Sequence, residues 1–113
     1  MASYPRLSHR LTLEAPTRTP DGSGGYTQSW TALGTLWAEL RPRTGRERTA
    51  SGAPMSVQGY KITVRGAPVG HPERPQALQR FRDGARVFLI EAVAERDAEG
   101  RYLTCIAAEE VAT

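Results

Sequence analysis

Apolar and polar side chains alternate with a period of two along most of this 113-residue chain. In residues 9–14, for example, Leu11 and Leu13 fall on one face of the pleat and their neighbours on the other. The same alternation recurs in residues 35–41 and 57–65, and no long segment shows the 3.6-residue period of an amphipathic helix. A period of two is typical of half-buried β-strands. The pattern therefore predicts an all-β fold.

Turn signals divide these strands. Asp83-Gly84 stands between two alternating segments and predicts a tight β-hairpin. Residues 16–25 are rich in Pro, Asp and Gly and are predicted to form a loop, and residues 96–100 a turn. The expected strands cover residues 9–14, 26–30, 35–41, 57–65, 79–82, 85–95 and 101–108. Chain length fits one domain over residues 1–113, a small antiparallel β-barrel or sandwich of six to seven strands.

One stretch, residues 41–56, shows no periodicity and is predicted to be a long, mobile basic loop. The formal net charge of the whole chain is +3, and the octapeptide 41–48 accounts for all of it. Its four arginines are Arg41, Arg43, Arg46 and Arg48. Guanidinium groups match phosphate and carboxylate oxygens, so the loop is a candidate contact for nucleic acid or for an acidic protein surface. A solvated charge run is the competing interpretation, because 14 of the 15 basic residues in the chain are Arg.

Other classes of protein and site are not supported by the sequence. No apolar run is long enough for a transmembrane helix, and the N-terminus has no secretory signal. Cys105 is expected to be a small core residue, and His9 and His71 have no partners at metal-ligand spacing. The acidic pair Glu109-Glu110 is expected to be solvated. We therefore predict no catalytic residue, no metal and no cofactor, in a soluble protein of a reducing compartment.

The two tryptophans are the remaining candidates for binding. Trp37 falls on the face of its strand opposite Leu36 and Ala38. It belongs either to a second core or to a subunit interface, and a core position is favoured because small barrels bury aromatic side chains readily. Trp30 could serve in either place.

Seven short motifs, read in order, carry a resemblance to a known family. They are HRLTL at 9–13, GYTQSW at 25–30, LWAEL at 36–40, TGRE at 44–47, YKITVR at 60–65, FLIEAV at 88–93 and RYLTC at 101–105. In this order the chain resembles the phage head–tail joining family. That family comprises the head-closure or stopper proteins of long-tailed bacteriophages and gene transfer agents.

The resemblance implies a structural virion protein and not an enzyme. It implies a small β-barrel subunit in a ring of six or twelve copies at the neck, between portal and adaptor on one side and the tail terminator or tail tube on the other. Such a ring retains packaged double-stranded DNA and docks the tail, after assembly in the bacterial cytoplasm. By position, loop 41–56 would project toward the axial channel, and residues 66–75 would face a neighbouring ring. Because the like-charged loops of a ring repel one another until DNA phosphates or acidic partner residues neutralise them, we predict that the loop is disordered in the isolated subunit and ordered on assembly.

Three other functions stay open at this point. A free-standing nucleic-acid-binding β-barrel would use the same arginines, and a tail terminator or another neck protein would share the fold. A small enzyme of unknown type ranks last.

Overall fold

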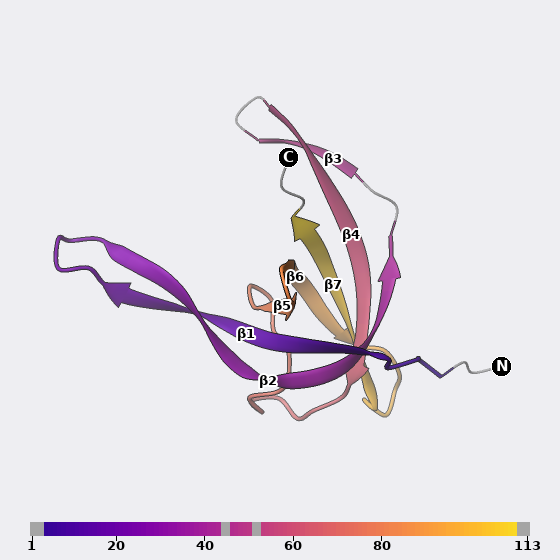
Figure 1. The fold of residues 1–113 in the computed structure, drawn as a ribbon. Helices are drawn as coiled ribbons and strands as arrows, with labels where there is room; N and C mark the ends of the chain where they lie inside the picture. The colour runs from indigo at the N-terminus through magenta and orange to yellow at the C-terminus, as the bar shows by residue number, and fades with distance from the viewer. Residues whose placement is uncertain (1–3, 44–45, 51–52, 111–113) are drawn as a thin grey trace.

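The computed structural model describes residues 4–43, 46–50 and 53–110, with the backbone alone for 46–50 and 53–57. Within these residues the structure consists of seven β-strands and connecting turns, with no helix. Figure 1 shows β1 (His9–Pro20), β2 (Tyr26–Pro42), β3 (Arg46–Ala50), β4 (Ala53–Arg65), β5 (Arg80–Asp83), β6 (Arg86–Glu95) and β7 (Tyr102–Glu110). The prediction of an all-β fold is confirmed.

Six of the strands form a sheet that closes on itself. Their order is β2-β1-β5-β6-β7-β4, and a further pairing between β2 and β4 closes the sheet. Every pairing is antiparallel, and β3 lies outside the closed sheet, paired with β4 alone. The Asp83-Gly84 hairpin joins β5 to β6 as predicted, with Gly84 at a positive φ of 60°.

The core fills the inside of this closed sheet. Leu11, Leu13, Ile62 and Val64 are fully buried, as the alternation predicts. Phe81, Phe88, Ile90 and Leu103 complete it from β5, β6 and β7. Cys105 is also fully buried, and burial raises the pKa of its thiol to about 12. The thiol is therefore protonated at neutral pH and acts as a small apolar side chain.

The first hairpin is much longer than the sequence suggests. Residues 16–20 were expected in a loop, yet β1 continues to Pro20 and pairs with an unbroken β2. We call residues 15–31 the β1–β2 arm; Figure 1 shows it projecting from the closed sheet. The radius of gyration is 15.5 Å, whereas a compact domain of this length has about 13 Å. The loop prediction failed because prolines are tolerated in a strand whose outer edge is unpaired.

The predicted loop 41–56 also contains regular backbone. Pro42 ends β2, as expected, but Arg46–Ala50 then pairs with the first residues of β4 in an antiparallel hairpin. Residues 44–45 and 51–52, and the side chains of 44–57, lie outside the described residues. The prediction of a loop is therefore wrong for the backbone of these residues. Residues 46–50 and 53–57 form a second hairpin, which we call the β3–β4 arm.

Candidate interaction surfaces

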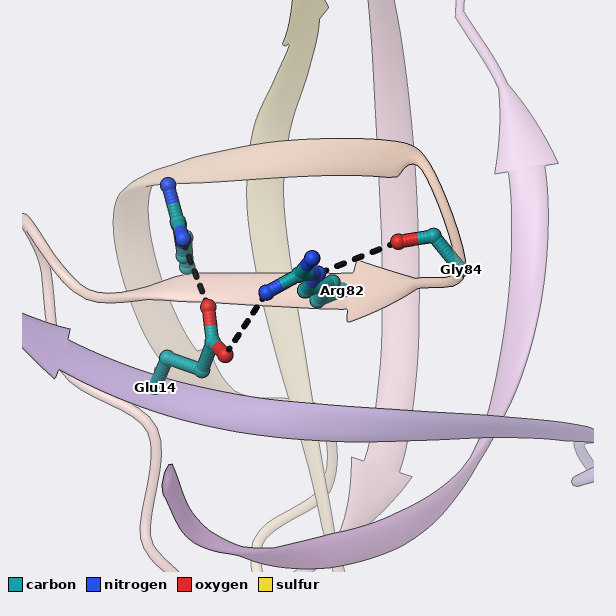
Figure 2. Close-up of polar contacts among 4 residues, drawn as sticks. Glu14, Arg82 and Gly84 are labelled. Atoms are coloured by element: carbon teal, nitrogen blue, oxygen red, sulfur yellow. Dashed lines mark hydrogen bonds and ion pairs between the residues drawn. The ribbon is translucent and has the colours of Figure 1, made fainter. Parts of the chain in front are cut away.

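A buried carboxylate marks the place where the β1–β2 arm leaves the closed sheet. The pairing of β1 with β2 shifts by one residue between Leu13 and Glu14, which is a β-bulge. The extra residue of the bulge is Leu33 on β2, and β1 keeps its alternation, with Leu13 opposite Phe81 and Glu14 opposite Arg80 on β5. Glu14 therefore lies on the face opposite Leu13, as strict alternation predicts, yet it is only 7% exposed. Figure 2 shows its carboxylate directed at the arginines of β5.

Two arginines neutralise Glu14. Arg80 Nε donates to Glu14 Oε1 at 2.7 Å, and Arg82 Nη1 lies 3.6 Å from Oε2. The Arg80 guanidinium also lies 4.0 Å from the centre of the Trp30 ring, which belongs to the arm. Arg80 therefore connects β1, β2 and β5. This arrangement fixes the base of the arm against the closed sheet.

A groove runs between the arm and the closed sheet beside this anchor. Its volume is about 490 Å³. The lining residues come from the arm, from the β5–β6 hairpin and from the ends of nearby segments: Pro16, Arg18, Gln28, Trp30, Leu78, Arg80, Val87, Leu89 and Glu110. Leu78 is 72% exposed and has a φ of 75°, a strained conformation for a leucine. Exposed apolar side chains and local strain are typical of functional surfaces.

Trp37 is on the surface, so the prediction of a core position is wrong. Its side chain is 55% exposed and lies beside a second hollow lined by Leu7, Thr35, Leu36 and Arg65. The sheet closes on itself around one core, so no second layer covers the outer face of β2. The alternative, an interface position, stays a prediction. Trp30 is half-buried against Arg80.

The four predicted arginines stand at the root of the β3–β4 arm and along it. Arg41 is exposed and its Nε donates to Glu39 Oε1 at 3.1 Å. Arg43 is exposed, and its backbone is held to β4: its N–H donates to the Gly59 carbonyl oxygen at 2.8 Å. Arg46 and Arg48 lie on β3 opposite Val57 and Met55, and their side chains fall outside the described residues.

One cluster was missed by reasoning from sequence. Arg86 donates to both carboxylate oxygens of Glu109, at 2.8 and 3.1 Å, and to the Tyr60 hydroxyl at 3.0 Å. Arg86 holds the pKa of Glu109 below its ordinary value, and Glu109 raises the pKa of Arg86. Glu109 was expected to be solvated, yet its side chain is 15% exposed. The cluster joins residues of three strands, β4, β6 and β7, so no local pattern in the sequence reveals it.

These surfaces define a class of protein. Among the described residues no three His, Cys, Asp or Glu gather as metal ligands, and no helix is long and apolar enough to cross a membrane. The side chains that line the groove beside the arm are mostly apolar, and Arg80 among them is paired with Glu14. Two hairpins project from one small closed sheet. Projecting strands and exposed aromatic residues on a rigid body are the features of a subunit built to assemble with other proteins.

Comparison with known proteins identifies the family. The family model described as "Phage head completion protein" matches residues 2–110. A solved chain, from a structure titled "Virion of native gene transfer agent (GTA) particle", is 48% identical, with a TM-score of 0.86 over 97% of this chain and 100% of that chain. No curated protein matches the sequence. The chain belongs to the phage head completion protein family and is a structural head–tail protein of a virion or virus-like particle.

Proposed function

We propose that this protein forms a homo-oligomeric ring of six or twelve copies in the neck of the particle, where it closes the head, retains packaged double-stranded DNA and docks the tail. Its neighbours in this proposal are the portal and adaptor on the head side and the tail terminator or tail tube on the other side. The observation that carries the proposal is the combination of a closed six-stranded sheet with two hairpin arms that leave it.

The closed sheet and the arms suit different requirements of a neck component. A closed sheet with a fully buried core keeps its shape and so fixes the angle between neighbouring subunits. Hairpins that leave that body reach surfaces of other molecules. The anchor at Glu14 and Arg80 supports this division, because it holds the base of the arm at a defined position on the closed sheet.

The β3–β4 arm is the proposed channel-facing element. Arg41, Arg43, Arg46 and Arg48 would bring four positive charges per subunit to the axis of a ring, where DNA phosphates neutralise them. Two of these arginines differ in what holds them. Glu39 pairs with Arg41, whereas no carboxylate lies within ion-pair distance of Arg43 in the part of the chain that the structure describes. Of these two, Arg43 is therefore the arginine whose binding to DNA or to an acidic partner would break no existing ion pair among the described residues.

The tryptophans are the proposed subunit contacts. Trp37 presents a large aromatic surface beside Leu7 and Leu36, and Trp30 lines the groove with its ring stacked on Arg80. The two sites lie on different parts of the surface. Two different surfaces per subunit are what head-to-tail contact around a closed ring requires.

Reconstruction of the intact particle neck tests the ring directly. The expected result is six or twelve copies of this chain between portal complex and tail, and full heads that lose DNA when the protein is deleted. Absence of the chain from the neck, or DNA-filled heads that stay stable without it, would refute the proposal.

The same arginines make a free-standing nucleic-acid-binding role the second candidate. Arg43→Ala combined with Arg46→Ala should then weaken DNA binding by the isolated protein and flatten the dependence of the affinity on salt concentration. A neck component predicts instead weak DNA binding by the isolated subunit, and loss of DNA retention in particles that carry the double variant.

A further inference from the structure

The two long edges of the β1–β2 arm are both free of strand pairing among the residues that the structure describes. On one side, β5 pairs with β1 only from Thr12 to Glu14, so β1 has no second neighbour from Ala15 onward. On the other side, β4 pairs with β2 only from Ala38 to Pro42. Each edge of the arm therefore carries backbone groups for which the closed sheet supplies no strand.

The edge formed by β1 is blocked by proline. Asp21 N–H donates to the Gly25 carbonyl oxygen at 3.1 Å, and residues opposite each other alternate between bonded and non-bonded pairs. Counting back along the register, Pro16, Arg18 and Pro20 occupy non-bonded pairs, so their backbone nitrogens face away from β2. Proline has no N–H, and two of these three donors are therefore missing. Such an edge resists the addition of another strand.

The edge formed by β2 has no such protection. Tyr26, Gln28 and Trp30 stand opposite the three outward residues of β1, so their N–H and C=O groups also point outward. In the described part of the chain these outward groups have no hydrogen-bond partner. Residues 26–38 contain neither proline nor a charged residue, in a chain that is 24% charged. Natural proteins interrupt exposed edges with both, so this edge has the chemistry of one that is covered in its working state.

We propose that, in the assembled ring, a strand of a second copy of this chain hydrogen-bonds along the β2 edge of the arm, at Tyr26–Trp30. This inference rests on the proposed ring. A second copy is favoured because identical subunits bring identical charges to their contact, and an uncharged edge lets two copies of a net-positive chain meet without repulsion. A surface that binds an acidic partner would instead be expected to carry arginines, as residues 41–48 do.

The difference between the two edges also limits the assembly. If both edges of each arm accepted strands, arms would pair side by side without limit, as in an open fibre. With the β1 edge blocked, each arm accepts one neighbour only. A closed ring then requires that each subunit accept a strand from one neighbour on its β2 edge and supply a strand of its own, from another surface, to the other neighbour.

Gln28→Pro and Arg18→Pro form a matched pair of variants, because Arg18 and Gln28 lie opposite each other in a non-bonded pair. Each substitution leaves the β1–β2 hydrogen bonds in place and removes one outward N–H. Gln28→Pro should lower ring assembly in particles at least about tenfold, the effect of one strong hydrogen bond per contact. Arg18→Pro should assemble within about twofold of the parent chain. Circular dichroism and thermal unfolding of both purified variants establish that they fold.

A photocrosslinking amino acid at Tyr26, in otherwise intact particles, identifies the occupant. The expected product is a covalent dimer of this chain. A crosslink to a different neck protein, or Gln28→Pro particles that assemble like the parent, overturns the inference and leaves the ring itself standing. Particles whose necks lack the chain altogether refute the proposed function instead, and this inference with it.

Discussion

Removal of the carboxylate at Glu14 should destabilise the protein more than any other single loss of charge at the base of the arm. The Glu14 side chain is 9% exposed and that of Arg80 18% exposed. Breaking such a pair by removing one partner costs about 3–5 kcal/mol in a protein interior. Arg80 keeps its contact with Trp30, worth about 0.5–2 kcal/mol. We therefore expect Glu14→Ala to lower the free energy of unfolding by about 2–3 kcal/mol.

Thermal and urea unfolding followed by circular dichroism measure this effect. A loss of that size lowers Tm by about 8–12 °C in a domain of this length. The control is Arg82→Ala, because Arg82 is half-exposed and its Nη1 lies 3.6 Å from Glu14. The Arg82→Ala variant should lower the free energy of unfolding by less than about 1 kcal/mol.

A double-mutant cycle isolates the ion pair itself. The double variant with Glu14→Ala and Arg80→Ala should lose less free energy of unfolding than the two single variants added together, by about 1–3 kcal/mol. The reason is that each single variant leaves the charge of the other residue buried without its partner, whereas the double variant leaves neither charge. Additive single costs, or an Arg82→Ala variant as damaging as Arg80→Ala, would show that this cluster does not hold the arm.

Three further predictions concern other parts of the chain. The pKa of Glu109 is lower in the folded protein than its ordinary value of 4.5, so the ion pair with Arg86 stabilises the protein fully above about pH 4.5 and is lost as the pH falls through the lower, folded pKa. Glu109→Gln should therefore remove part of the acid destabilisation that urea titrations at different pH values measure. An unchanged pH profile would contradict this. A methyl group on Gly66 would collide with the Gly100 carbonyl oxygen, whereas a methyl group on Gly70 would meet open space. Thermal unfolding should therefore show that Gly66→Ala lowers the free energy of unfolding by at least about 2 kcal/mol. Gly70→Ala should lower it by about 1 kcal/mol, because of the positive φ alone. Asparagine tolerates the left-handed region better than leucine does, so Leu78→Asn should raise the free energy of unfolding by about 0.5–1 kcal/mol, and a destabilised variant would contradict the strain inferred there.

The fold class could be predicted from sequence because a period of two is a local property. Leu11, Leu13, Ile62 and Val64 are inside because each strand that carries them has one buried face, and that face is legible from single side chains. The Asp83-Gly84 hairpin was predictable for the same reason, since its turn chemistry lies in two adjacent residues.

The errors share a different cause, because each depends on which strand lies beside which. Pro16 and Pro20 indicate a loop unless the edge of β1 is known to be free. Glu14 appears exposed unless β5, with Arg80 and Arg82, is known to lie beside it. Trp37 appears buried unless the sheet is known to close around a single core. Pairing topology is a long-range property, and the residues that mark the candidate surfaces depend on it.

The same dependence gives the uncharged segment 26–38 its meaning. As sequence it is an unremarkable run of neutral residues that a buried strand would also have. In the structure Tyr26 is 65% exposed and Trp37 55%, so burial within the subunit does not explain the absence of charge. An edge strand of a monomer is under selection to carry charge or proline, and β1 does carry two prolines, directly opposite. Two edges of one hairpin face the same solvent and differ in protection. The simplest physical reason is that only one of them faces solvent once the particle is built.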